Sequence, residues 1–348
     1  MTVTTVPARP EQDASQRPIP WRRMAWVIWR QHRIALSGLA VFLGAVAVYV
    51  WIVGLQLHHA HTAATTCNLN SPACADLMNH FNTMNGVLQH GYTLQIVPAL
   101  IGAFIGAPVL ARELETGTFR YAWTQGFQRW RWALAKLLAL AVVVTAAAAA
   151  LSLLISWYYQ PYLAAGNQTL ELSELSPFGA FVFDLRGVAF AAWTLAAFGI
   201  GCLAGMLIRR VVPAMVATLA AYTGLALLAG NLLRQHYLSP LLTSNLTVPG
   251  SAWIMSQWWT KAGNFAFGGR PPEALLGQLG PAPAIGPSGK PSPATLTGCL
   301  AQHGYTQWTS YQPASRVWTF QWIEGGWLLA LSVLLIALTV WLVRQRAT

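Results

Sequence analysis

The chain has 348 residues, of which 55% are hydrophobic and only 9% are charged, and its mean hydropathy is +0.44. Few soluble domains have this composition, which excludes an ordinary soluble enzyme. The net charge of +11 could suggest a nucleic-acid partner, but the basic residues gather at the ends of apolar segments, where they suit anionic lipid headgroups. We therefore predict a membrane protein with no nucleic-acid partner.

Six segments are apolar and long enough to cross a hydrocarbon core of about 30 Å, which takes roughly 20 helical residues. A membrane barrel would instead show short segments of alternating polarity. The sequence thus predicts an all-α integral membrane protein with six transmembrane helices. They are Ile34–Leu57, Leu94–Ala111, Trp132–Tyr158, Phe183–Ile208, Val211–Leu233 and Ile323–Val343.

The 21 Lys and Arg residues predict the orientation of these spans, because most of them fall on one side if both termini are cytoplasmic. Lys and Arg are enriched in cytoplasmic loops. We therefore expect cytoplasmic N and C termini, a six-span membrane domain over residues 34–348, and extracytoplasmic loops over about 58–93 and 234–320.

The N-terminal region divides into two parts. Residues 1–20 are polar and contain proline, which predicts a disordered cytoplasmic tail and not a cleaved signal peptide. Residues 21–33 form either an interfacial amphipathic helix or an ordinary basic flank of the first span. On a helical wheel one sector holds Arg22, Arg23, Arg30 and Arg33, roughly opposite Trp21, Met24 and Ile28.

Three of the four cysteines lie in the predicted outer loops: Cys67, Cys74 and Cys299. On an oxidising face they allow one disulfide and leave one cysteine over, and the sequence does not fix the pairing. Cys67 with Cys74 is the local choice. Cys202 lies within an apolar span, which is typical of a small packing residue.

The outer loops also contain potential metal ligands, since five histidines fall in or near the first of them. Neither a His-Glu-x-x-His nor a paired Cys-x-x-Cys motif accompanies them, so we predict no metal site and no catalytic residue. A P-loop is absent too, because Gly289 and Lys290 are followed by Pro291. This chain is not expected to hydrolyse ATP. The histidines are His58, His59, His61, His80 and His90.

Charges within the spans are few, which argues against an ion-coupled carrier. Asp184 and Arg186, near the outer end of the fourth span, mark either an outer gate or headgroup-level residues. Close helix packing is indicated by two Gly-x-x-x-Gly motifs, although the sequence does not identify the helix that each one contacts. Their glycines are Gly102 and Gly106, and Gly201 and Gly205.

The last outer loop contains a Pro- and Gly-rich stretch over residues 270–293, which predicts a flexible insertion. Trp318, Phe320 and Trp322 then alternate with polar residues just before the sixth span. They form either a lid over a substrate path or an interfacial aromatic belt.

The segment between the second and third spans concentrates charge. Arg112, Glu113 and Glu115 end the second span, Thr116 and Gly117 break it, and an aromatic, amphipathic stretch over 119–130 follows. This segment resembles the first cytoplasmic loop of ABC-2 type transporter permeases, in which an Arg-Glu-x-Glu-x-Gly-Thr core follows the second span. The positions that match the family pattern are Glu113, Glu115, Gly117, Thr118, Arg129 and Lys136. The Pro-x-Ser-Arg that is frequent in the family before the lysine is replaced here by residues 125–129.

The resemblance implies a function for the chain as a whole. It would be the permease subunit of a bacterial ABC exporter in the plasma membrane, with the 111–136 loop docked on a separate ATPase that holds ATP and Mg²⁺. Six spans are half of what the family uses, so a homodimer is expected, and a similar second chain could replace one copy. Two alternatives stay open: a membrane-bound metal-dependent enzyme that uses the outer histidines, and a scaffold or sensor that transports nothing.

Overall fold

The structure, a computed structural model, describes residues 21–68, 71–85, 94–117, 129–165, 177–244, 248, 251–269, 271–272, 275 and 293–345. The predictions for residues 1–20, for Thr118 and the aromatic stretch over 119–128, and for most of the Pro- and Gly-rich insertion fall outside these residues. The chain forms two compact units, which we describe separately. Unit 1 comprises Met1–Tyr158, Leu185–Leu227 and Glu324–Thr348, and unit 2 comprises Tyr159–Asp184 and Leu228–Ile323.

Six helical segments of the described residues are long and apolar enough to cross a membrane, which confirms the six-span prediction. Span one is α1 (Trp21–Thr66), and span three is α7 (Arg129–Tyr158). Span two joins α4 (Ile96–Ile101), the π-helical turn η2 (Gly102–Gly106) and α5 (Ala107–Thr116). Span four is α10 (Gly187–Ile208), span five is α11 (Val211–Leu228) with η4 (Ala229–Leu233) and η5 (Arg234–His236), and span six is α14 (Val317–Gln345), which follows η6 (Ala314–Arg316).

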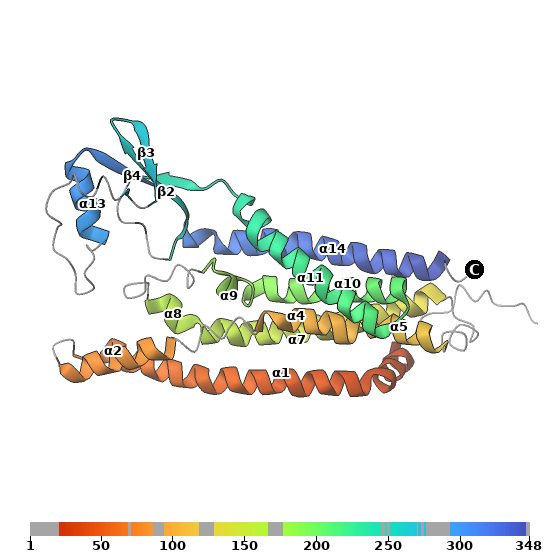
Figure 1. The fold of residues 1–348 in the computed structure, drawn as a ribbon. Coiled ribbons are helices and arrows are strands. Elements are labelled where there is room, and N and C mark those ends of the chain that lie inside the picture. The colour runs from red at the N-terminus through yellow and green to blue at the C-terminus, as the bar shows by residue number, and fades with distance from the viewer. Residues whose placement is uncertain are drawn as a thin grey trace, which may run out of the picture. The chain divides into compact units, whose positions relative to one another are not determined.

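Helix α1 is longer than the predicted first span, because it begins at Trp21 and continues to Thr66. The segment over 21–33 is therefore continuous with the span. Figure 1 shows the first turns of α1 bent away from the long remainder of the helix. The side chains of Trp26, Trp29 and Ile34 are exposed in this part of the chain, as expected for groups that meet lipid.

Helix α10 lies at the centre of unit 1, where the two Gly-x-x-x-Gly motifs pack on each other. A Cβ atom added to Gly102 would lie 2.5 Å from Ala197 O, and one added to Gly201 would lie 2.8 Å from Ala107 N. Only glycine permits this separation of the two backbones. Since the contacts advance in the same direction along both segments, spans two and four run parallel.

Span six also runs parallel to span four, because Trp193 contacts Glu324 and Gly199 contacts Leu335 further along both helices. Span one runs parallel to span three, since Gly54 and His58 in the second half of α1 contact Trp157 near the end of α7. Odd and even spans therefore alternate in direction. The start of α1, the end of α5, the start of α7 and the end of α14 all lie at the same end of the helices of unit 1 (Figure 1).

Unit 2 contains a four-stranded antiparallel sheet in the segment that we predicted as the last outer loop. The strands are β1 (Leu241–Thr243), β2 (Trp253–Lys261), β3 (Asn264–Gly268) and β4 (Tyr305–Gln312), in the order β1-β4-β2-β3. Strands β2 and β3 form a hairpin whose two turn residues, Ala262 and Gly263, both have positive φ. The sheet was not predicted, and the short helices α8 (Gln160–Ala165), α9 (Ala180–Phe183) and α13 (Pro293–Gln302) accompany it in the unit.

An ion pair and an aromatic cluster stabilise unit 2. Arg234, only 3% exposed, pairs with Asp184 and lies 4.2 Å from the centre of the Phe183 ring. Phe320 is buried against Phe178. The predicted alternation around Phe320 is therefore part of a helix, α14, from which Trp318 and Trp322 project with about 60% exposure.

Candidate functional site at the ends of spans two, three and five

The end of span two is set by a glycine. Helix α5 stops at Thr116, and Gly117 follows with a φ of 69°, the left-handed conformation that commonly ends helices. The hydroxyl of Thr116 donates a 2.8 Å hydrogen bond to the carbonyl of Arg112. The acidic side chains of this last turn, Glu113 and Glu115, thus lie on a helix end of fixed direction.

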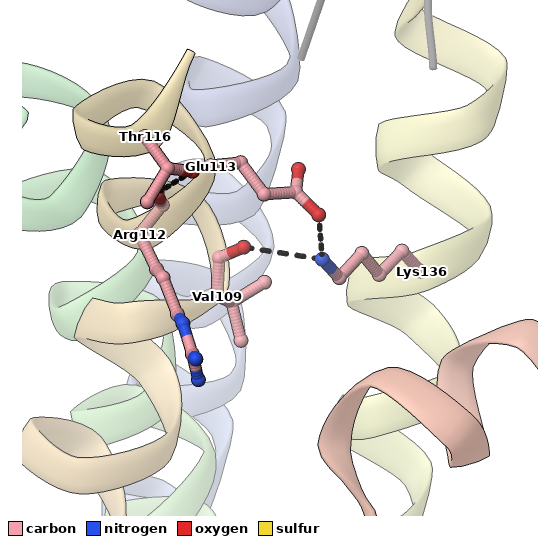
Figure 2. A network of polar contacts seen from close by, with 5 residues as sticks. All are labelled: Val109, Arg112, Glu113, Thr116 and Lys136. Atoms are coloured by element: carbon pink, nitrogen blue, oxygen red, sulfur yellow. Dashed lines mark hydrogen bonds and ion pairs between the residues drawn. The ribbon is translucent and has the colours of Figure 1, made fainter. Parts of the chain in front are cut away.

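Glu113 forms an ion pair with Lys136 of span three. Lys136 Nζ lies 2.6 Å from Glu113 Oε1 and 3.2 Å from Val109 O, so the lysine reaches from α7 to both the side chain and the backbone of α5 (Figure 2). The ammonium also lies 5.0 Å from the centre of the Trp132 ring. The pair joins the two helices on either side of the loop.

This ion pair is largely buried. The side chain of Lys136 is only 1% exposed, and that of Glu113 is 17% exposed. A charged pair of this kind stabilises a structure only while both members are present, because each alone would be a desolvated charge.

Glu115 contacts span five. Its Oε2 accepts a 3.0 Å hydrogen bond from the backbone N–H of Val211, the first residue of α11. Only Arg209 and Arg210 separate α10 from α11, and Arg209 has a φ of 59°. A carboxylate suits a helix N-terminus, where the N–H groups lack partners within the helix and the dipole is positive. Glu115 therefore links span two to the turn between spans four and five.

We name Glu113, Glu115, Lys136 and Val211 the end cluster. Arg112 is exposed beside it. Thr118 falls outside the described residues, and so does the side chain of Arg129, whose backbone begins α7. The cluster joins spans two, three and five at the end of the helices where the 117–129 segment leaves span two.

Replacing Glu115 by alanine is expected to loosen the start of α11 and to lower the free energy of unfolding by about 1 kcal/mol, as for the loss of other helix caps. Hydrogen–deuterium exchange of the first amides of α11 should become faster. Glu115→Gln keeps an acceptor oxygen and should retain most of the protection. Unchanged exchange in the alanine variant would show that the cap contributes nothing.

Cys67 and Cys74 lie at and just beyond the other end of α1, where His58, His59 and His61 also lie. Cys67 and Cys74 form a disulfide with their Cα atoms 5.4 Å apart, and it closes the turn into α2 (Pro72–Asn85). Among the described cysteines, Cys202 is free and buried, and Cys299 is free and partly buried.

The histidines of this region do not assemble a metal centre within the described part of the chain. No group of three or more His, Cys, Asp or Glu there could hold a metal ion. His58 instead stacks on Trp157 with a ring-centre distance of 4.5 Å, and its Nε2 lies 3.1 Å from Trp157 O. His90 falls outside the described residues.

Sequence reasoning missed Glu324. We placed the start of the sixth span at Ile323, which put this carboxylate at the membrane edge. In the structure α14 already begins at Val317, and the side chain of Glu324 is completely buried. Its Oε1 accepts a 2.8 Å hydrogen bond from Trp193 Nε1 of span four. The sequence feature that could have identified Glu324 is a single acidic residue next to a long apolar segment.

The six apolar helices define a multi-pass membrane protein, and the end cluster marks the place where three of them meet a concentrated charge. The chain belongs to the ABC-2 membrane transporter related family, whose model matches residues 40–234, more than half of the chain. The match runs from within α1 to the end of span five and includes the whole end cluster. No curated protein and no solved structure shows significant similarity to the chain. The protein is thus a transporter permease, and its family implies an ATPase subunit as partner.

Proposed function

We propose that this permease receives the force of ATP hydrolysis through its 111–136 segment, which docks on the separate ATPase subunit. The observation that carries the proposal is the end cluster, in which Glu113 binds Lys136 and Glu115 binds the Val211 N–H. Because these contacts join spans two, three and five, a displacement of the segment would move the three helices together. Two helices joined only by a flexible loop would not transmit such a displacement.

The orientation follows from the same proposal. The docking segment and both termini of the chain face the cytoplasm, as the positive-inside rule predicts. The disulfide between Cys67 and Cys74, at the opposite end of α1, supports this orientation because disulfides persist in oxidising compartments. ATP and Mg²⁺ are then held by the ATPase, and the permease contributes no cofactor site and no hydrolytic residue.

The permease works as a homodimer that forms the translocation path, along which the cargo leaves the cell. Closed assemblies with a two-fold axis are the commonest way in which identical subunits pair. A plasma membrane of a bacterium is consistent with the six spans and the family. The apolar, aromatic-rich spans suit a hydrophobic or amphipathic cargo.

Docking through the loop predicts that Trp123→Ala combined with Phe127→Ala abolishes capture of the ATPase. The tagged permease would be purified with the ATPase encoded beside it, and the ATPase recovered for each permease should fall at least about tenfold, as when aromatic hot-spot residues are removed. These two residues lie outside the end cluster, so the ion pair that holds the spans together is left intact.

The control for that experiment is Phe265→Ala, which removes an aromatic ring that is 70% exposed on β3, in the predicted outer segment. Recovery of the ATPase should match the wild type. All variants must show the thermal transition of the wild type, since a misfolded permease would also lose its partner. Equal recovery with the Trp123 and Phe127 variant would refute docking through this loop.

A further inference from the structure

Glu324 is a carboxylate enclosed by the helices of unit 1. Its side chain has no exposed surface, and it lies within Ala314–Gln345, a segment apolar enough to cross a membrane. Removing a carboxyl group from water is unfavourable, so an ionisable residue inside a membrane span is rare and is first considered as part of a functional site. The end cluster does not use Glu324, and its burial calls for a separate explanation.

The indole of Trp193 binds this carboxylate, and rings of spans five and six contact Trp193. Trp193 of span four donates its indole N–H to Glu324 Oε1 at 2.8 Å. The Trp193 ring meets Tyr222 of span five at 5.6 Å and 77°, and Trp327 of span six at 5.9 Å and 88° between ring planes. Tyr222 and Trp327 thus contact the ring whose N–H binds Glu324.

These groups share one chemical preference. The face of an aromatic ring attracts cations, most strongly for tryptophan, and rings that surround a cation form the usual binding site for quaternary ammonium groups. When it is ionised, the carboxyl group of Glu324 adds a full negative charge. An anionic ligand would be repelled, and a neutral one would gain nothing from Glu324.

We propose that Glu324, Trp193, Tyr222 and Trp327 bind the cationic group of a hydrophobic organic cation, which is the cargo of the transporter. This inference rests on the proposed transport function and adds the charge class of the cargo. In the structure the indole N–H of Trp193 donates a hydrogen bond to Glu324 Oε1. When spans four, five and six separate, a bound cation would replace the indole N–H beside Glu324. The hydrogen bond from Trp193 would be lost, and an ion pair between the cation and Glu324 would form next to the aromatic rings.

The test uses two probes of nearly the same shape and opposite charge, tetraphenylphosphonium and tetraphenylborate. Binding of each is measured to the full-length permease in lipid nanodiscs without the ATPase, after subtraction of binding to empty nanodiscs. The wild type should bind the phosphonium. Glu324→Gln, which keeps size and hydrogen-bonding capacity, should weaken that binding by at least about tenfold, the effect expected for loss of a charged partner.

Asp76→Asn is the matched control, because it removes the same charge from an exposed position on α2. It should bind tetraphenylphosphonium as the wild type does. Equal binding of the two probes by the wild type, or undiminished phosphonium binding by Glu324→Gln, would overturn the inference. Since the ATPase is absent, these results do not depend on whether docking through the 111–136 segment is correct.

A second measurement needs no variant and covers the case in which Glu324→Gln does not fold. Dicyclohexylcarbodiimide modifies carboxyl groups in apolar surroundings, and mass spectrometry of the wild-type peptides would follow its reaction with Glu324. Tetraphenylphosphonium should slow this modification at least about tenfold, and tetraphenylborate should not. Equal modification with and without the phosphonium would reject the site.

Discussion

Replacing Glu113 by glutamine is expected to destabilise the permease by about 3 kcal/mol, because it leaves the ammonium of Lys136 buried without a counter-charge. The lysine is 1% exposed, so water cannot substitute for the lost carboxylate. Its hydrogen bond to Val109 O remains, which places the loss at the low end of the range for broken buried pairs. The free energy of unfolding in mild detergent would measure it.

A substitution of the partner lysine and the double variant provide the controls. Lys136→Met should cost less than Glu113→Gln, since Glu113 is 17% exposed and can reach solvent. Combining the two substitutions removes both charges, so the double variant should regain a large part of the lost stability. Losses that simply add would mean that the two side chains do not stabilise each other.

Replacing Gly201 by alanine is expected to separate spans two and four. The added Cβ would lie 2.8 Å from Ala107 N and closer still to Gly102 O. Both are backbone atoms, which cannot move aside as a side chain can. We expect a loss of about 3 kcal/mol in the free energy of unfolding, at the upper end for overpacked sites.

Gly224→Ala is the matched control, since a Cβ at this position of α11 would meet no atom within 4 Å. It should leave the free energy of unfolding unchanged or raise it by up to about 1 kcal/mol, the gain of alanine over glycine within a helix. Unfolding of both variants would be followed under one set of conditions. A Gly201→Ala protein as stable as the Gly224→Ala protein would contradict the close packing of these helices.

The sequence alone predicted the class of structure because each span is a local property. Apolar length identified all six spans, and the left-handed residue Gly117 was predicted as the end of span two. The sheet of unit 2 was missed for a different reason. Strand β2 pairs mainly with β4, far along the chain, and its hairpin turn at Ala262 and Gly263 lacks the Asn-Gly or Asp-Gly pair that signals such turns most strongly.

For the candidate site, the sequence supplied the residues and the tertiary structure supplied their partners. Glu113, Glu115 and Lys136 were all identified from the pattern of the loop. That Glu113 binds Lys136, 23 residues away, and that Glu115 binds the N–H of Val211, 96 residues away, follows only from the packing of spans two, three and five.

The same division applies to the helix interior. Composition and apolar length by themselves determined that this chain is a six-span membrane protein, because a span must satisfy its backbone hydrogen bonds internally whatever its neighbours are. Which glycine motif packs on which, and the bond between Glu324 and Trp193 across 131 residues, were decided by tertiary structure. Apolar length carries no information about the face that a helix turns to its neighbours, and that face depends on side-chain shape along the whole contact.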